Sequence, residues 1–229
     1  MQLISFSQIA DFWACPKLYE YRQVLKYPGL KRNTQARIQG KWLHQQFHLH
    51  ALGHEVALAQ DPAYTDLWQH YLHETAAYAD WQCRSEWSCH IPWNPAASIW
   101  LFGRMDRLYL KDTELVLLDF KTGESQSELQ TLQISFYAYL LWQTQKVLGI
   151  AQLQQIRARV LNLNQGEASE LLFTAENIQQ AKHQLEPLLQ ALSHKKSAPY
   201  YPAPRSVQGQ PWCTMCEYQG LCLEGRNYA

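Results

Sequence analysis

The chain has 229 residues, with 20 basic and 20 acidic side chains and therefore no formal net charge. Neutrality excludes nucleic-acid binding through bulk charge alone, although it is compatible with a local basic groove. A hydrophobic content of 47% is enough for a folded core and argues against disorder. Because a domain has roughly 100–200 residues, we expect one domain over residues 1–229. The longest apolar run, Phe136 to Trp142, is shorter than the ~18 residues of a membrane helix, so no membrane span is expected.

The first third of the chain is expected to be helical. Ser7 is a suitable N-cap for a first helix, and Pro16 should end that helix and begin a second one. Apolar residues at helical spacing then predict helices over 34–51 and 63–81.

The middle of the chain is expected to form strands. Residues 85–93 and 98–110 read as strands separated by a turn at Asn94-Pro95. Residues 114–121 contain the continuous apolar run Leu115 to Leu118, which suits a strand covered on both faces.

The remaining elements define the fold class. We expect a helix over 127–147, a strand over 153–163, a helix over 174–194 capped by Thr174, and little regular structure from Ala198 onward. This order predicts an α/β fold whose mixed central sheet is flanked by helices.

Charged side chains stand at the end of the apolar strand. Asp119 and Lys121 are two residues apart, so they project to one face of the strand while Phe120 points into the core. If the strand that contains Asp106 is a neighbour, its carboxylate approaches Asp119, and two close carboxylates repel each other unless a cation lies between them. Oxygen ligands of this kind suit Mg²⁺ or Mn²⁺. The alternative is a purely structural ion pair between Asp119 and Lys121, in which each charge at the strand end neutralises the other.

Such a centre would suit phosphodiester hydrolysis. A divalent ion polarises a phosphodiester oxygen and lowers the pKa of a water. Lys121 would orient that water, accept its proton or stabilise developing negative charge, and the sequence does not choose among these roles.

Four short motifs in this order make the chain similar to a known family. They are Gly40-x3-His44, Gly103-Arg104-Met105-Asp106, Asp119-Phe120-Lys121-Thr122-Gly123 and Gln133-x3-Tyr137. Together they resemble the RecB-like branch of the PD-(D/E)xK nuclease superfamily, over Ser5 to Cys222. The resemblance implies a restriction-endonuclease-like core in which His44, Asp106, Asp119 and the Phe120 carbonyl bind the metal. By the same resemblance, Asp106, Asp119 and Lys121 are catalytic, and Gln133 and Tyr137 position DNA.

Several of these residues have ordinary alternatives. His44 and His48 are four residues apart and could bind zinc from one helix face, but surface or partial core positions are commoner for such histidines. Gln-x3-Tyr occurs three times in the chain, and the copy at Gln133 is preferred because it follows the catalytic strand. Glu86 opens a strand and is expected to be structural.

The six cysteines are unevenly distributed. No secretory signal follows Met1, so we expect a cytoplasmic protein, in which structural disulfides are rare. Cys213, Cys216 and Cys222 crowd the last part of the chain, and Cys15 is the isolated candidate for a fourth ligand. Four thiolates hold either zinc or an iron–sulfur cluster, and their spacing alone leaves both open.

The order of these cysteines resembles a more specific group. An early Cys15-Pro16 and a late Cys213-x2-Cys216-x-Tyr218-x3-Cys222 around a nuclease core are similar to the "iron-staple" nucleases, which include AddB-type nuclease domains and CRISPR adaptation nucleases. The resemblance implies a [4Fe–4S] cluster on these four cysteines that ties residues 1–25 to residues 198–229. Cys83 and Cys89 match nothing and are expected to be small core residues.

These features together predict a metal-dependent deoxyribonuclease. We expect an exonuclease on single-stranded DNA or DNA ends, acting in CRISPR spacer acquisition or DNA repair. No nucleotide-binding P-loop motif occurs, so a helicase or adaptation-complex protein would be a separate partner. The alternatives are a catalytically inactive iron–sulfur subunit that binds DNA and a redox-sensing iron–sulfur protein. Candidates for a local basic groove are Lys17, Arg22, Lys31, Arg32, Arg104 and Arg107.

Overall fold

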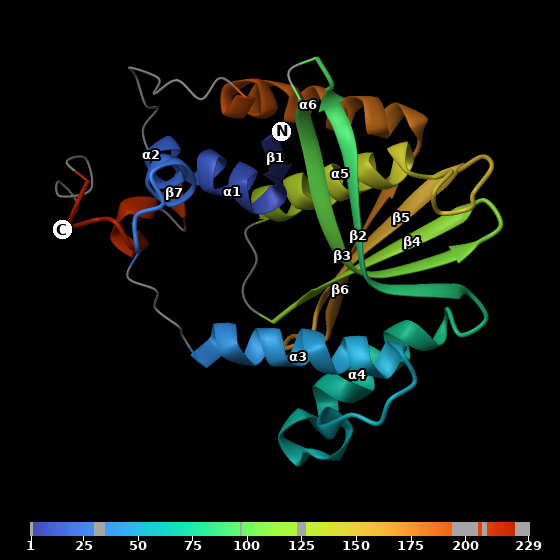
Figure 1. The fold of residues 1–229 in the computed structure, drawn as a ribbon. Coiled ribbons are helices and arrows are strands. Elements are labelled where there is room, and N and C mark those ends of the chain that lie inside the picture. The colour runs from blue at the N-terminus through green and yellow to red at the C-terminus, as the bar shows by residue number, and fades with distance from the viewer. Residues whose placement is uncertain are drawn as a thin grey trace. The chain divides into compact units, whose positions relative to one another are not determined.

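The computed structural model describes residues 2–29, 35–96, 98–122, 127–193, 206–207 and 210–222. The chain divides into two compact units (Figure 1). One unit comprises Thr34–Ile91 and Phe102–Lys182, and the other comprises Met1–Asn33, Pro92–Leu101 and His183–Ala229. The expectation of a single domain over residues 1–229 stays a prediction.

A mixed sheet forms the framework, as the sequence predicts. Its strands are β1 (Gln2–Ser5), β2 (Gln82–Asn94), β3 (Ile99–Lys111), β4 (Glu114–Lys121), β5 (Gln155–Asn162) and β6 (Glu167–Phe173). The order is β1-β3-β4-β5-β6, and β2 pairs with β3. Strand β4 is antiparallel to β3 and parallel to β5, which is antiparallel to β6. The pairing of Arg107 with Leu118 makes the strands of Asp106 and Asp119 direct neighbours.

Helices cover both sides of β4 in the unit that contains residues 102–182. They are α3 (Gln35–Ala51), α4 (Thr65–Ala76) and α5 (Ser127–Gln143), with short 3-10 turns η2 (Ala57–Gln60) and η3 (Pro62–Tyr64). Leu43 and Phe47 of α3, Trp68 and Tyr71 of α4, and Phe120 of β4 belong to one buried apolar cluster. Figure 1 shows α3 and α4 on one side of these strands and α5 on the other. Both sides of the strand are therefore covered, which explains the apolar run in β4.

The other unit contains the two ends of the described chain. Its elements are α1 (Phe6–Ala14), α2 (Pro16–Tyr19), the π-helix η1 (Glu20–Val24), the short pair β7 (Ser206–Val207) and β8 (Gln210–Pro211), and the 3-10 turn η4 (Trp212–Met215). Helix α6 (Ala175–Ser193) begins in one unit and ends in the other. Ala14 and Leu18 pack against Tyr218 in a small buried cluster of this unit.

Some local predictions were wrong. The first helix begins at Phe6, after Ser5 rather than Ser7, because the side chain of Gln8 accepts a 2.8 Å hydrogen bond from the Ser5 amide. Strands β1 and β6 were missed. Strand β6 is exposed at every residue except Phe173, so it has no inward-facing alternation to find. Short strands and a 3-10 turn occur after Ala198, where little regular structure was expected.

Thr174 occupies the position directly before helix α6, which begins at Ala175. Its carbonyl accepts a 3.0 Å hydrogen bond from the Ile178 amide, and its own amide and hydroxyl donate to the Asn177 side chain at 3.1 and 2.9 Å. The described contacts of its hydroxyl include no amide of the first turn, so a side-chain cap by Thr174 stays a prediction. Within the described ranges, no helix has both the length and the apolar character needed to cross a membrane.

Candidate active site and cysteine pocket

Helix α3 brings His44 close to the end of β4 because Gly40 has no side chain. A Cβ added to Gly40 would lie 3.1 Å from Oγ1 of Thr122, which is closer than ordinary van der Waals contact. The Gly40-x3-His44 motif therefore reflects a close approach of helix and strand one turn before the histidine.

Asp106 of β3 is held from two sides. Its Oδ1 lies 3.3 Å from Nδ1 of His44, and its Oδ2 accepts a 2.9 Å hydrogen bond from the amide of Phe120. Burial acts to raise the pKa of Asp106, but His44 and the Phe120 amide outweigh it, so the pKa lies below its ordinary value. Burial acts to lower the pKa of His44, but Asp106 and the neighbouring carboxylates outweigh it and raise this pKa. The protonated form of His44 beside the Asp106 carboxylate is thus favoured. A metal cation bound there would replace the positive charge that the His44 imidazolium places beside Asp106.

Asp119 and Lys121 form an ion pair at the end of β4. Nζ of Lys121 lies 2.7 Å from Oδ2 of Asp119, and the Asp119 side chain is 5% exposed while that of Lys121 is 28% exposed. That oxygen has no aligned hydrogen bond. Burial raises the pKa of Asp119, and the attraction of Lys121 compensates only in part. The carboxylate is therefore incompletely satisfied, which is the condition that a bound cation relieves.

Helix α5 contributes Gln133 and Tyr137. Oε1 of Gln133 accepts a 3.0 Å hydrogen bond from Lys121, and its Nε2 donates to Oδ1 of Asp119 at 3.5 Å and to the Tyr137 hydroxyl at 3.3 Å. Burial raises the pKa of Tyr137, so its hydroxyl keeps its proton. The amide of Gln133 thus contacts both members of the ion pair. A role of these residues in positioning DNA stays a prediction.

The close approach of α5 to β3 depends on Gly103. A Cβ added there would lie 2.4 Å from Cδ1 of Leu140 and 3.4 Å from Cδ1 of Tyr137. The glycine that begins the Gly103-Arg104-Met105-Asp106 motif therefore makes room for the helix that carries Tyr137.

Glu86 joins the group, although its position at the start of a strand predicted a structural role. Ligand atoms of His44, Glu86 and Asp106 lie within 4.8 Å of one another, and the described residues contain no second such group of three. The backbone of Glu86 has a φ of 51°, which is unusual for a residue other than glycine. Oε2 of Glu86 also forms an ion pair with Nε of Arg104, which lies 3.1 Å away. Only the pairing of β2 with β3 brings this carboxylate beside Asp106, and no motif spacing marks it.

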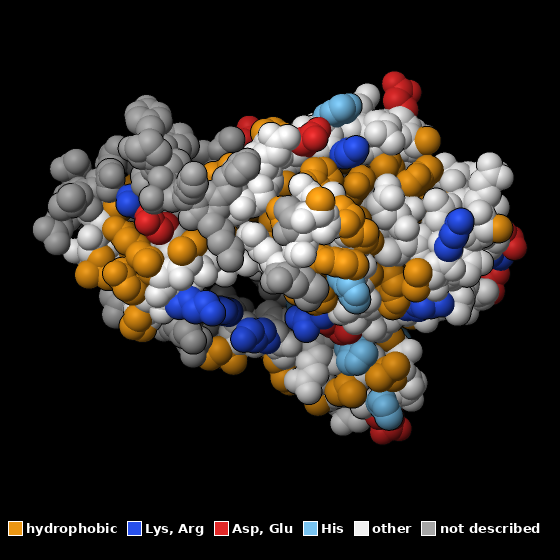
Figure 2. Space-filling model, turned by 45° about the horizontal axis from the view of Figure 1, so that its top comes forward, with side chains coloured by type: hydrophobic (Ala, Val, Ile, Leu, Met, Phe, Trp, Pro, Cys, Tyr) orange, Lys and Arg blue, Asp and Glu red, His pale blue; other side chains and the backbone are white. Residues whose placement is uncertain are grey.

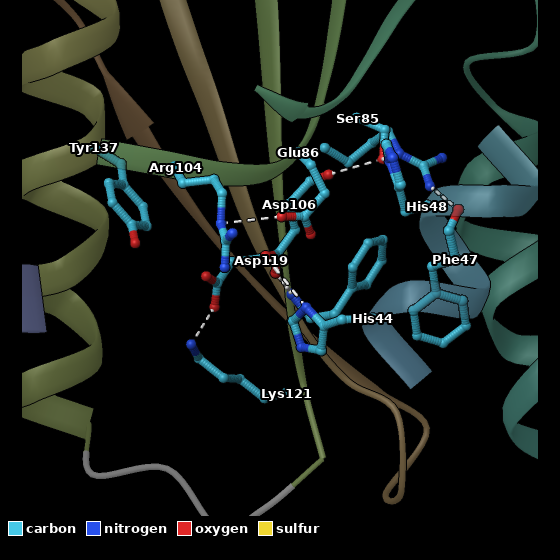
Figure 3. Close-up of polar contacts among 12 residues, drawn as sticks. His44, Phe47, His48, Ser85, Glu86, Arg104, Asp106, Asp119, Lys121 and Tyr137 are labelled. Atoms are coloured by element: carbon cyan, nitrogen blue, oxygen red, sulfur yellow. Dashed lines mark hydrogen bonds and ion pairs between the residues drawn. The ribbon is translucent and has the colours of Figure 1, made fainter. Parts of the chain in front are cut away.

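The predicted residues thus converge from four elements, α3, β3, β4 and α5, and Glu86 adds a fifth, β2. Figure 3 shows His44, Glu86, Asp106, Asp119 and Tyr137 around one space. Carboxylate oxygens with one imidazole nitrogen form a donor set that fits Mg²⁺ or Mn²⁺. The described contacts of Phe120 involve its amide and ring, and its carbonyl as a ligand stays a prediction.

Most of the predicted groove residues are engaged elsewhere. Lys17 pairs with Glu20, and Arg22 pairs with Asp11 and Glu217. Arg107 is only 2% exposed, so the prediction that it lines a basic groove was wrong. The Arg104 side chain is 67% exposed and pairs with Glu86. On the face drawn in Figure 2, lysine and arginine side chains occur among acidic and apolar ones. Lys31 and Arg32 lie outside the described residues.

Four cysteines converge in the unit that contains both chain ends. Cys15, Cys213, Cys216 and Cys222 line one pocket. Cys15 lies between α1 and α2. Cys213 lies in η4, and Cys216 and Cys222 lie in the turns that follow it, where the amide of Cys222 donates to the carbonyl of Tyr218 at 3.0 Å. No disulfide joins the four among the described residues. The fold therefore brings together residues almost two hundred positions apart, as the sequence predicted.

The remaining two cysteines differ from each other. Cys89 is buried, as expected for a small core residue, and burial raises its pKa to about 12. Cys83 is exposed, so the expectation of a core position was wrong for it. Cys83 is the second residue of β2, where the strand is exposed, whereas Cys89 lies at a buried position further along it.

The sheet, the acidic cluster and the lysine define a class of protein. The sequence model of the PD-(D/E)XK nuclease superfamily matches residues 3–223, which is nearly the whole chain. The chain belongs to the PD-(D/E)XK nuclease superfamily.

Comparison with solved structures agrees at the level of the fold. The chain is similar to a crystal structure titled "Putative exonuclease" from Eubacterium rectale, with 10% identity, a TM-score of 0.54, and coverage of 86% of this chain and 83% of that one. It also matches the crystal structure of SSO0001, with 13% identity, coverage of 98% of this chain and 88% of that one, and a TM-score of 0.47. No curated protein matches the chain.

Proposed function

We propose that this protein is a metal-dependent deoxyribonuclease with a [4Fe–4S] cluster, and that it acts as an exonuclease on single-stranded DNA or DNA ends. The observation that carries the nuclease assignment is the position of the Asp119–Lys121 pair on the strand next to the His44–Asp106 pair. The superfamily supports nuclease activity with DNA as substrate. CRISPR spacer acquisition and DNA repair are the processes that we propose for it, with a helicase or adaptation protein as partner.

The metal site has a defined set of candidate ligands. We assign His44, Asp106, Asp119 and the Phe120 carbonyl to Mg²⁺ or Mn²⁺, and we add Glu86 because its carboxylate lies beside the first two. An ion bound there would supply Lewis-acid chemistry to a phosphodiester. Three strand-borne carboxylates and an imidazole would fix its position from four elements of the fold, β2, β3, β4 and α3.

The protein groups around that position have separate tasks. Lys121 points its ammonium at Asp119 and Gln133, so it stands where negative charge develops during hydrolysis. Gln133 holds that ammonium and the Asp119 carboxylate in one orientation. Tyr137, with its proton retained, is a hydrogen-bond donor for a phosphate oxygen. The exposed guanidinium of Arg104 is suited to a neighbouring phosphate.

Cleavage of labelled single-stranded DNA with Mn²⁺ tests the assignment. Lys121→Ala is expected to lower cleavage by about 10²–10⁴-fold, the usual contribution of a group that acts in the transition state. Lys111→Ala is the matched control, because Lys111 is an exposed lysine of the same unit that pairs with Asp80. Activity that is equally low in the wild type and both variants would instead favour the alternative, an inactive iron–sulfur subunit that binds DNA.

The convergence of four cysteines in one pocket supports a metal site held by four thiolates. Four thiolates hold either zinc or an iron–sulfur cluster, and a shared pocket is common to both. We propose the cluster because the order Cys15-Pro16 and Cys213-x2-Cys216-x-Tyr218-x3-Cys222 resembles the iron-staple nucleases.

The ultraviolet–visible spectrum of anaerobically purified protein, with iron and sulfide analysis, tests the cluster. Broad sulfur-to-iron absorption and four irons per chain are expected, and Cys216→Ser should lose colour and stability because metal binding is coupled to folding. Cys83→Ser is the control, since Cys83 lies outside the pocket. A colourless wild type that contains zinc would contradict the cluster and leave the nuclease site untouched. A cluster whose oxidation switches DNA affinity without loss of folding would favour the redox-sensing alternative.

A further inference from the structure

Arg107 is a buried arginine next to the candidate metal site. It follows Asp106 on β3 and is 2% exposed. Nη1 donates to the hydroxyl of Tyr109 at 3.2 Å, and Nη2 donates to the hydroxyl of Tyr71 at 3.2 Å. The guanidinium carbon also lies 5.8–5.9 Å from the ring centroids of Tyr71, Tyr109 and Phe120. The side chain is thus enclosed by aromatic groups.

This burial is unfavourable for stability taken alone. Nε of Arg107 is buried without a hydrogen-bond partner. The partners found among the described residues are hydroxyls, one carbonyl and rings, and they include no carboxylate. Burying a cation without a counter-charge costs free energy, and an apolar side chain of similar volume would often stabilise a core more. Core packing by itself therefore does not explain an arginine here.

The remaining bond joins two elements of the active site. Nη2 of Arg107 donates a 2.7 Å hydrogen bond to the carbonyl oxygen of Phe47 in α3. His44 lies one helical turn before Phe47, and its Nδ1 lies 3.3 Å from Asp106. Asp106 and Arg107 are adjacent on β3, and each of them contacts a residue of α3. Figure 3 shows Phe47, His44 and Asp106 in this arrangement.

We propose that Arg107 is a positioning residue that fixes α3 against β3 and thereby sets the separation of His44 and Asp106 in the metal site. The inference rests on the proposed metal centre. A planar guanidinium suits this task because its fork donates to a backbone carbonyl and two hydroxyls in fixed directions, whereas a lysine ammonium is a point charge on a flexible stem. Arg107 would act from outside the ligand set, because it joins α3 and β3, the elements that carry His44 and Asp106.

Mn²⁺ titration by calorimetry, below the unfolding temperature of each variant, tests this inference. Arg107→Met removes the charge and the fork, and Arg107→Lys keeps the charge without the fork. Both are expected to weaken Mn²⁺ binding by about 10–100-fold, as is typical when an outer-shell partner is lost. Tyr109→Phe is the matched control, because it removes one hydrogen bond of Arg107 from the same buried cluster and leaves the Phe47 bond intact. Its Mn²⁺ affinity should stay near that of the wild type even where its unfolding temperature falls.

The outcomes separate this inference from the function on which it rests. If the wild type binds Mn²⁺ and Arg107→Lys binds it equally well, the positioning role is wrong while the metal centre stands. If Tyr109→Phe weakens binding as much as Arg107→Lys does, the effect is general destabilisation and the positioning role is again overturned. If the wild type binds no Mn²⁺, or if His44→Ala binds it as the wild type does, the proposed metal centre is wrong and the role assigned to Arg107 is withdrawn with it.

Discussion

The amide of Phe120 donates a 2.9 Å hydrogen bond to Oδ2 of Asp106. The strand that carries the Asp119–Lys121 pair therefore also fixes the carboxylate of the neighbouring strand. The same residue packs its ring 5.0 Å from that of Phe47, on the helix that carries His44. One residue of β4 thus links the acidic pair of the sheet to the histidine of α3, so the geometry of the site depends on the packing of β4.

Glu86→Gln is expected to weaken Mn²⁺ binding by about tenfold, because it removes one negative charge beside His44 and Asp106 while keeping the side-chain shape. Calorimetric titration measures this change. Asp80→Asn is the control, since Asp80 is a carboxylate of the same unit that pairs with Lys111. Equal affinities of Glu86→Gln and the wild type would show that Glu86 serves only to pair with Arg104.

Gly103→Ala is expected to destabilise the protein by about 1–3 kcal/mol, the usual range for an overpacked site. The added methyl would lie 2.4 Å from Cδ1 of Leu140 and would push α5 away from β3. Because α5 carries Gln133 and Tyr137, cleavage should fall as well. Urea denaturation gives the free energy of unfolding. Gly40→Ala should have the smaller effect, since its methyl meets Thr122 at 3.1 Å. If Gly40→Ala lowered the free energy of unfolding more than Gly103→Ala does, α5 would shift to accommodate the added methyl more easily than its packing indicates.

His50 is expected to make stability depend on pH. Its Nδ1 lies 3.1 Å from the Tyr71 hydroxyl, and burial, together with the nearby Arg107, lowers its pKa below the ordinary value of 6.5. A lowered folded-state pKa favours the neutral form, so this contribution is present above pH 6.5 and is lost as the pH falls through the folded-state pKa. The difference in unfolding free energy between the wild type and His50→Gln should therefore shrink below about pH 6.5. A difference that grows on acidification would contradict the lowered pKa.

Thiol labelling is expected to distinguish the cysteines. Cys83 is exposed and should react in the native protein, whereas Cys89 should resist because it is buried and its pKa is raised to about 12. If the four pocket cysteines hold a cluster, they too should be protected until the cluster is removed. Mass spectrometry of the labelled peptides identifies the sites. Rapid labelling of Cys216 in the coloured, native protein would argue against its role as a ligand.

The sequence by itself determined the features that are local or periodic. The two-residue spacing of Asp119 and Lys121 places them on one face of any strand, and the apolar run before them marks that strand as covered on both sides. Pro16 begins a helix because its fixed φ and missing amide suit only the first turn. The clustering of Cys213, Cys216 and Cys222 likewise needs only a short run of local turns, so sequence spacing was enough to mark it.

The tertiary structure decided what depends on residues far apart in the chain. Glu86 becomes a candidate ligand only because β2 pairs with β3, and Arg107 is buried only because aromatic rings of α4, β3 and β4 enclose it. Strand β6 forms because β5 offers it hydrogen bonds, whatever its own apolar pattern. Local spacing fixes which way a side chain points along its own element. The partner that it meets is set by the packing of distant elements, and that packing is what turns the separate motifs into one site.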